Sequence, residues 1–186
     1  EDLLKICFLG RIAPVKNLDY ALKVLSKLTL PINFDIYGPK EDKRYWNLCK
    51  EIIDSLPKSI NVKYMGPIEN ESVHDMFQNY DLFFLPTKGE NFGHVILESM
   101  SAGTPTLIAD TTPWKNLQEP GVGWDIPLSL PNEFANAIEK MFQLDEREYS
   151  KMRNSVRNYA EKVTNDVSIL NQSKELFLNS LGRDNV

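Results

Sequence analysis

Apolar residues along the chain gather into six short runs that predict β-strands. Several of these runs are rich in β-branched or aromatic residues and are apolar at successive positions, which is typical of parallel strands buried on both faces. The predicted strands are Lys5–Leu9, Asn33–Tyr37, Val62–Met65, Asp81–Leu85, Thr106–Ala109 and Gly123–Ile126.

Segments with helical spacing of apolar residues separate these strands. The predicted helices are Leu18–Leu28, Arg44–Leu56, Glu71–Tyr80 and Phe92–Ala102, and after Pro131 only helices follow, at Asn132–Leu144, Glu146–Glu161 and Val167–Leu181. Strand–helix–strand alternation implies right-handed crossovers between parallel strands. The sequence therefore predicts an α/β fold, a Rossmann-like, doubly wound and mainly parallel six-stranded sheet with helices on both faces and further helices at the C-terminus.

Length and composition limit what the chain can be. Its 186 residues are expected to form one domain, residues 1–186, and the start almost inside a strand suggests a domain of a longer protein. The formal net charge of −5 argues against a general nucleic-acid binder. No apolar run approaches the roughly 20 residues of a membrane span and no secretory signal is present, so a cytoplasmic location is expected. Cys7 and Cys49 are expected to be buried, reduced thiols.

The segments that follow the predicted strands point to a ligand site. In open α/β sheets, ligands bind outside the carboxyl ends of the strands. The segments after the first five strands read GRIAPVKN, YGPK, MGPIEN, PTKGENFG and ADTTPW, and four of the five contain glycine. Tight turns between strands and helices use glycine anyway, but four on one edge of the sheet favour a cleft where main chain approaches a ligand.

Two cations, Arg11 and Lys16, lie in the first of these segments. An arginine fork with a lysine point charge suits a diphosphate, although either cation alone is better explained as a solvated surface residue. Neither the P-loop pattern nor the dinucleotide G-x-G-x-x-G pattern is present, and no Asp-x-Asp pair is available to hold a metal. A diphosphate bound here would be neutralised by these cations and by backbone N–H groups, without Mg²⁺.

The stretch KGENFGHVILESMSAGTP, residues 88–105, places two acids around a helix start. Glu90 precedes the predicted helix, whose free N–H groups offer an anion site. Glu98 falls two turns later, about 12 Å along a regular helix axis, on a face expected to be small or apolar. A carboxylate there needs donors, either a neighbouring lysine or arginine or two vicinal hydroxyls such as a ribose diol. An elongated ligand with phosphates between two polyhydroxyl ends, a nucleoside diphosphate sugar, fits this layout.

The two histidines add little to this picture. His74 is expected at a helix surface, and His94 at a helix start is explained equally well by phosphate contact or by packing. The sequence supports no Ser/His/Asp or Cys/His constellation.

The segments FLGRIAPVKNLDYALKVL, FDIYGP, VKYMGPIENESV and DLFFLPTKGENFGHVILESMSAGTPTLIAD resemble the C-terminal domain of retaining GT-B glycosyltransferases of the group often called group 1 or family 4. The resemblance runs from about Leu4 to Trp124. Its hallmark is Glu, seven residues, Glu, which Glu90 and Glu98 match, followed here by SAGTP.

The resemblance implies a role for each matching residue. Arg11 and Lys16 would hold the donor diphosphate, and Glu98 would take the ribose diol. Glu90, the candidate catalytic residue, would contact donor-sugar hydroxyls near the reacting carbon. The remaining donor contacts would be made mostly by backbone, at Gly38, at Met65, Gly66 and Ile68 for the nucleobase, and at Asn91, Phe92 and Gly93 for phosphate or sugar.

The implied reaction is transfer of a sugar from a nucleoside diphosphate sugar to a saccharide, lipid-linked or other glycan acceptor, with retention and without metal or other cofactor. Whether retention uses front-face attack or a covalent intermediate stays open, so Glu90 is not assigned as a nucleophile. The acceptor would bind an N-terminal domain that is absent here, so the isolated chain is expected to be an inactive donor-binding half. For the full-length enzyme, peripheral attachment to a membrane is a further option.

The sequence departs from the family pattern after the fifth strand, where DTTPWKNLQEPGVG carries Trp114 in place of small residues and leaves the donor-sugar contacts open. Two rival classes also stay open: a non-catalytic Rossmann-like nucleotide-binding module, and another GT-B enzyme such as a nucleotide-sugar epimerase or a phosphorylase. A flavodoxin-like receiver lacks support, because no acidic cluster follows the first strand.

Overall fold

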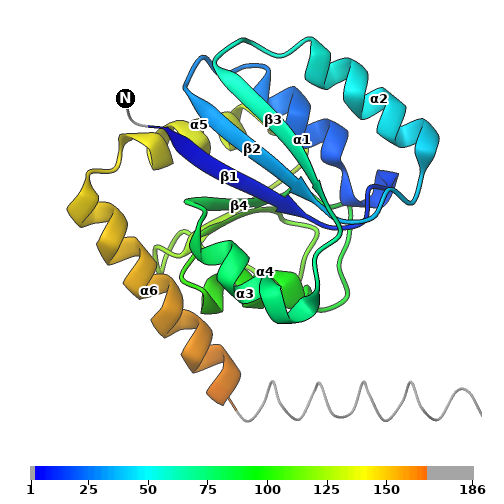
Figure 1. The fold of residues 1–186 in the computed structure, drawn as a ribbon. Helices are drawn as coiled ribbons and strands as arrows, with labels where there is room; N and C mark the ends of the chain where they lie inside the picture. Colours follow the sequence, from blue (N-terminus) through cyan, green and yellow to red (C-terminus); the bar gives the residue numbers. More distant parts are fainter. Residues whose placement is uncertain (1–2, 167–186) are drawn as a thin grey trace, which may run out of the picture.

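A computed structural model describes residues 3–166 of the chain, and this part contains one six-stranded parallel sheet between two layers of helices (Figure 1). The strand order is β3-β2-β1-β4-β5-β6, and every neighbouring pair is parallel. The strands are β1 (Leu4–Leu9), β2 (Ile32–Tyr37), β3 (Ile60–Gly66), β4 (Leu82–Leu85), β5 (Thr106–Ala109) and β6 (Gly123–Ile126). This order reverses direction at β1, so the Rossmann-like prediction is confirmed.

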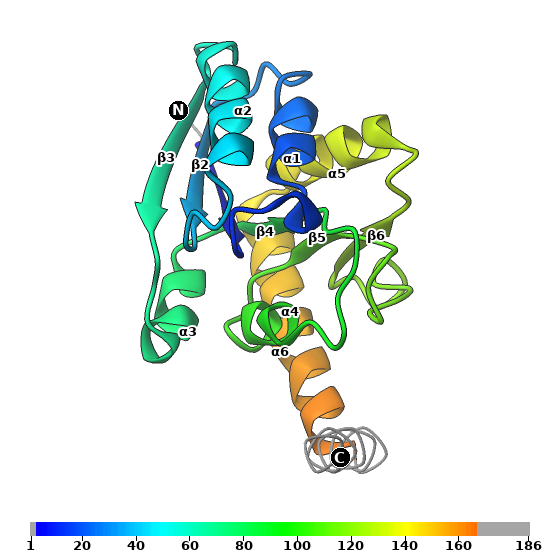
Figure 2. The ribbon, with the colours of Figure 1, turned by 90° about the vertical axis from the view of Figure 1, so that its right-hand side faces the viewer.

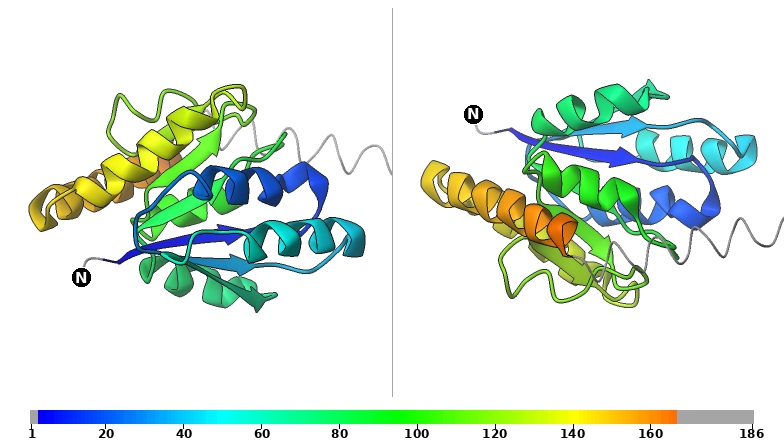
Figure 3. Two further views of the ribbon diagram at one scale, coloured as in Figure 1. Left: turned by 90° about the horizontal axis from the view of Figure 1, so that it is seen from above. Right: turned by 90° about the horizontal axis from the view of Figure 1, so that it is seen from below.

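Helices lie on both faces of the sheet (Figures 2 and 3). Helices α1 (Leu18–Leu25), α2 (Lys43–Asp54) and α5 (Pro131–Gln143) lie on one face. Helices α3 (Asn70–Gln78), α4 (His94–Ser101) and α6 (Glu146–Asn165) lie on the other, where α6 packs along α4. The predicted helix Val167–Leu181 lies outside the described residues.

The prediction that the strands are apolar on both faces holds for β4 and β5, which are buried at every position. It is wrong for β2 and β3, where buried and partly exposed residues alternate. Helix α3 packs beside α4 instead of covering the outer strands, so one face of β2 and β3 carries polar residues. Asp35 on that face accepts a hydrogen bond of 2.7 Å from the hydroxyl of Tyr80.

Local signals explain where two of the helices begin. Asp42 precedes α2, and its carboxylate accepts hydrogen bonds from the N–H groups of Arg44 and Tyr45, as a helix N-cap does. Helix α4 begins at His94, two residues later than predicted, because Gly93 before it has a left-handed backbone with φ of 76°.

Both cysteines are buried and free, as predicted. Burial raises the pKa of the Cys7 thiol well above its ordinary value and raises that of Cys49 to about 12. Within residues 3–166, the helices are too short or too polar to cross a membrane.

Candidate functional site

The loops after β1, β2 and β3 touch one another through main chain. The N–H of Gly10 donates to the carbonyl of Tyr37 at 3.1 Å, and the N–H of Gly38 donates to the carbonyl of Gly66 at 2.9 Å. Gly38 has a φ of 129°, and a Cβ atom there would lie 2.0 Å from the carbonyl oxygen of Gly10. The first two loops therefore leave no room for a side chain between Gly10 and Gly38. We call Gly10, Gly38 and Gly66, which are linked through these main-chain contacts, the main-chain floor.

The loop after β1 is also joined to the loop after β4, since β1 and β4 are neighbours in the sheet. Asn17 has a left-handed backbone, is buried, and donates from its side-chain amide to the carbonyl of Pro86 at 2.9 Å. The N–H of Lys88 donates to the carbonyl of Val15 at 2.8 Å. These contacts hold the two loops side by side.

The joined loops bring Lys16 and Glu90 into an ion pair. The Nζ atom of Lys16 lies 2.5 Å from Oε1 of Glu90, and the two side chains are only 16% and 11% exposed. The sequence analysis expected both residues at this edge, Lys16 as a diphosphate contact and Glu90 as a sugar contact. It did not predict that the two side chains pair. Because ion pairs that are shielded from water are screened less than surface pairs, this contact is expected to order both loops.

Arg11 lies at the same edge but is more open to solvent. Its guanidinium Nη1 donates to both carboxylate oxygens of Glu41, at 2.8 and 3.2 Å. The two side chains are 56% and 48% exposed. Glu41 was not singled out from the sequence, although its place shortly after β2, in YGPKE, is the signal that could have found it.

Gly93 shapes the start of α4. It is buried, it forms the N-cap, and no side chain of the described part of the chain caps this helix. A Cβ atom on Gly93 would lie 2.9 Å from Cδ1 of Ile96 and 3.2 Å from Nε1 of Trp114. The first amide groups of α4 therefore lack the side-chain oxygen that usually satisfies one of them. Asn91, which was predicted to contribute backbone here, is exposed.

Trp114, in the loop after β5, contacts the same segment. Its indole Nε1 donates to the carbonyl of Phe92 at 2.8 Å, and the two rings pack edge to face with centroids 5.7 Å apart. The hydroxyl of Thr111 donates to the carbonyl of Thr87 at 2.6 Å. Trp114, which departs from the family pattern, thus holds the loop after β5 against the loop after β4.

Glu98 does not lie on a buried face as predicted. It is exposed, and within residues 3–166 it makes no hydrogen bond or ion pair. Ile96 and Met100 form the buried stripe of α4, and Glu98 lies about 200° around the helix from each of them. Partial burial of its carboxyl group raises the pKa of Glu98, while nearby His94 acts in the opposite direction. Glu90 precedes α4, as predicted.

The predicted nucleobase segment lies at the end of edge strand β3. Met65 is 49% exposed, and Ile68 is partly buried. Gly66 has a φ of 86°, and a Cβ atom there would meet nothing within 4 Å. The space beside Gly66 is therefore open, next to the main-chain floor.

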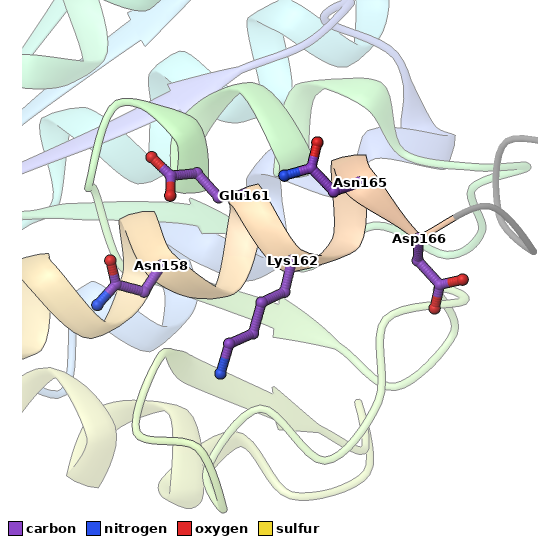
Figure 4. A pocket seen from close by; sticks show the side chains of 5 residues that line it. All are labelled: Asn158, Glu161, Lys162, Asn165 and Asp166. Atoms are coloured by element: carbon purple, nitrogen blue, oxygen red, sulfur yellow. The ribbon is translucent and has the colours of Figure 1, made fainter.

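The predicted site residues thus lie at the carboxyl ends of parallel strands, on the loops that follow them, or on the helix after such a loop, at one edge of the sheet. A separate shallow depression lies on α6, lined by Asn158, Glu161, Lys162, Asn165 and Asp166 (Figure 4). One helix and the residue after it form this depression, which shares no residue with the loops. Within residues 3–166, no cluster of three or more His, Cys, Asp or Glu side chains is arranged to hold a metal ion.

Residues 1–163 match the family of glycosyl transferases group 1, and the chain belongs to this family. The match and the fold confirm the resemblance to the C-terminal domain of GT-B glycosyltransferases. Among curated proteins, mannosylfructose-phosphate synthase of Agrobacterium fabrum is 30% identical over 108 residues, covering 54% of this chain and 24% of that protein. The D-inositol 3-phosphate glycosyltransferase of Rhodococcus erythropolis is 28% identical over 112 residues, covering 56% and 25%. The chain therefore spans about a quarter of the length of these relatives.

Several solved structures share the fold, and some of them are glycosyltransferases. The catalytic domain of cholesterol-α-glucosyltransferase from Helicobacter pylori matches with a TM-score of 0.67 and 16% identity, over 86% of this chain and 98% of that one. Anabaena HepE, solved in complex with UDP and glucose, matches with a TM-score of 0.70 and 20% identity, over 96% and 49%.

Proposed function

We propose that this chain is the donor-binding domain of a retaining glycosyltransferase, which moves a sugar from a nucleoside diphosphate sugar to a saccharide, lipid-linked or other glycan acceptor. The observation that carries the proposal is the pairing of Lys16 with Glu90 at the carboxyl edge of β1 and β4, in a chain of the group 1 family. Lys16 would contact the phosphate and Glu90 the sugar hydroxyls, so the pair would lie where the two parts of such a donor join.

Arg11 and Lys16 would bind the diphosphate. The Arg11–Glu41 pair is exposed, and exposed ion pairs contribute only about 0–1 kcal/mol. A charge-assisted hydrogen bond to phosphate contributes about 1.5–3 kcal/mol, so Arg11 would exchange Glu41 for the donor at little cost. The unfilled N-cap of α4 would place backbone N–H groups of the 91–93 segment beside the same phosphates.

Lys16 would keep Glu90 in place while it binds phosphate. An ammonium group has three donors, and only one is used by Oε1 of Glu90. Glu90 would then be held with a carboxylate oxygen available to the hydroxyls of the donor sugar. We assign Glu90 as the catalytic residue through this contact, which strengthens where charge develops near the anomeric carbon, and not as a nucleophile.

The nucleoside would extend from the main-chain floor toward β3. The open space beside Gly66 and the exposed Met65 leave room for a base next to backbone groups. Glu98, which lacks a hydrogen-bond partner within residues 3–166, would accept from the ribose diol. These residues would bind the donor without a metal ion, since Arg11 and Lys16 supply the positive charge.

The acceptor would be bound by a second domain, N-terminal to this one in the full-length enzyme. The chain covers only about a quarter of the length of the curated relatives, and this supports the arrangement. We place the full-length enzyme in the cytoplasm, with peripheral attachment to a membrane in the case of a lipid-linked acceptor.

Calorimetry of the chain with UDP-, GDP- and ADP-sugars tests the proposal. One nucleotide series should bind, and its affinity should be the same with and without EDTA. Absence of binding by all three series would refute the donor site, and a strict need for Mg²⁺ or Mn²⁺ would refute metal independence. Robust sugar transfer by residues 1–186 alone would refute the division into a donor half and an acceptor half.

A further inference from the structure

The loop between β4 and α4 is fastened at two points. Near its middle, Glu90 is held by Lys16 from the loop after β1. At its end, the Phe92 carbonyl accepts a 2.8 Å hydrogen bond from the indole of Trp114, in the loop after β5. The first fastener belongs to the proposed donor contacts, but the second is outside the roles that the sequence pattern assigns.

The second fastener fixes the direction of a backbone amide. In a trans peptide the C=O of one residue and the N–H of the next point in opposite directions, and the described residues contain no cis peptide. A carbonyl of Phe92 that points at Trp114 therefore turns the Gly93 N–H away from the indole. Gly93 is suited to this place because its φ is 76° and a Cβ atom would lie 3.2 Å from Nε1 of Trp114.

Contacts within the loop after β5 and with β6 hold Trp114 in place. Its backbone N–H donates to the hydroxyl of Thr112 at 3.2 Å. Two residues further, Asn116 adopts a left-handed backbone, and the N–H groups of Asn116 and Leu117 donate to the carboxylate of Asp125 at 3.0 and 2.8 Å. Trp114 is only 7% exposed, so packing and these backbone contacts determine the orientation of its indole.

A purely apolar role does not account for the indole nitrogen. A phenylalanine would fill most of the same space and make the same edge-to-face contact with Phe92. The nitrogen adds one directed hydrogen bond, and its acceptor is the peptide that joins the candidate loop to α4.

We propose that Trp114 is a positioning residue of the donor site, which acts through the Phe92 carbonyl to aim the Gly93 amide at the diphosphate. This inference rests on the proposed function, because it assumes that the donor phosphates bind at this loop. Trp114 touches the loop and not the reacting atoms, so its effect on the donor is indirect.

The test compares Trp114→Phe with Trp124→Phe in the full 186-residue chain. Trp114→Phe removes the N–H and keeps the ring; Trp124 is a partly buried tryptophan of β6 whose indole makes no hydrogen bond within residues 3–166. Inorganic pyrophosphate, UDP, GDP, ADP and the parent nucleosides are titrated calorimetrically or by NMR. Trp114→Phe should weaken pyrophosphate and the bound nucleoside diphosphate about three- to tenfold and leave the nucleoside unchanged, while Trp124→Phe changes none of them.

A second measurement begins with the wild-type chain and repeats the experiment on Trp114→Phe. In a ¹H–¹⁵N spectrum, the Gly93 amide should shift when pyrophosphate is added, and this shift should be smaller in Trp114→Phe. The inference is overturned if wild-type pyrophosphate binding leaves the Gly93 amide unmoved, if Trp114→Phe binds pyrophosphate as the wild type does, or if nucleoside and diphosphate weaken equally. Failure of the wild type to bind any of the three nucleotides would overturn the proposed function and this inference with it.

Discussion

Lys16 and Glu90 stand 74 positions apart in the sequence and meet through atoms 2.5 Å apart, in the space between the loops after β1 and β4. We expect this pair to contribute more to stability than the pair Lys23–Asp19 within α1, in which the lysine side chain is 59% exposed. A double-mutant cycle of Lys16→Met and Glu90→Gln, followed by urea unfolding, should give a coupling energy of about 1.5–3 kcal/mol. The cycle for Lys23 and Asp19 should give about 0.3–0.5 kcal/mol. Equal couplings would mean that the shielded position of Lys16 and Glu90 has no energetic effect.

Arg11 and Glu41 provide a matched pair of variants for the proposed diphosphate site. Arg11→Ala should weaken the nucleoside diphosphate by about 1.5–3 kcal/mol, which is roughly ten- to 150-fold. Glu41→Gln removes the competing carboxylate, so it should leave the affinity unchanged or increase it. Calorimetry in the presence of EDTA measures both. A loss of affinity in Glu41→Gln equal to that in Arg11→Ala would show that the pair acts as a structural unit.

Glu90 and Glu98 should respond differently to the two parts of the donor. Glu98→Gln should weaken a free nucleoside diphosphate and its sugar conjugate alike, because the contact is to ribose. Glu90→Gln should weaken only the sugar conjugate, since the change leaves Lys16 free for phosphate. In the full-length enzyme Glu90→Gln should also lower turnover. Calorimetry with both ligands decides the matter, and equal losses for both ligands in both variants would make the carboxylates structural.

The raised pKa of Glu98 predicts how this residue affects stability as pH changes. Partial burial raises the pKa, with His94 opposing it, so the folded chain favours the protonated carboxyl relative to the unfolded chain, whose pKa is about 4.3. The favourable contribution is complete below about pH 4 and is lost as pH rises through the folded pKa. Glu98→Gln should therefore be as stable as the wild type or more stable at pH 7, and the difference should disappear toward pH 4. Urea unfolding at both pH values checks this, with Glu139→Gln on the exposed side of α5 as the control.

The main-chain floor predicts two different costs for the same substitution. The new methyl group of Gly66→Ala faces open space, so the free energy of unfolding should fall only by the cost of a positive φ, about 1–2 kcal/mol. Gly38→Ala adds a collision with the Gly10 carbonyl to a similar backbone strain, so its free energy of unfolding should fall clearly further. Thermal or urea unfolding of the two variants measures the difference. Similar losses would mean that the loops after β1 and β2 can separate easily.

The fold could be predicted from the sequence because strand and helix patterns alternate strictly through the first five strands. Topology then follows from right-handed crossovers, and parallel strands bring their carboxyl ends to one edge. On this basis the sequence alone predicts that Arg11, Lys16 and Glu90 lie at the same edge, as they do in the structure. It could not supply the partner of each charge, because pairing depends on how loops from different strands lie against each other.

Two errors in the sequence reasoning have definite physical causes. Glu98 was expected on a covered face because helical spacing places it near Val95 and Ala102; in the structure Ile96 and Met100 lie on the buried side of α4 and Glu98 faces outward. The polar face of β2 and β3 was missed because a strand pattern does not say where the next helix packs, and α3 lies beside α4.

Helix α4 has one end at Gly93 and the other under α6. Arg153 and Arg157 of α6 both donate to the carbonyl of Ala102, the C-cap residue of α4. A Cβ atom on Gly103 would lie 2.6 Å from the side chain of Arg157. Eight helical residues span only about 12 Å, which is too short for appreciable bending. Helix α4 therefore joins two parts of the molecule by a short, straight segment: the loop that carries Glu90 precedes it, and the contacts of Arg153 and Arg157 with Ala102 follow it.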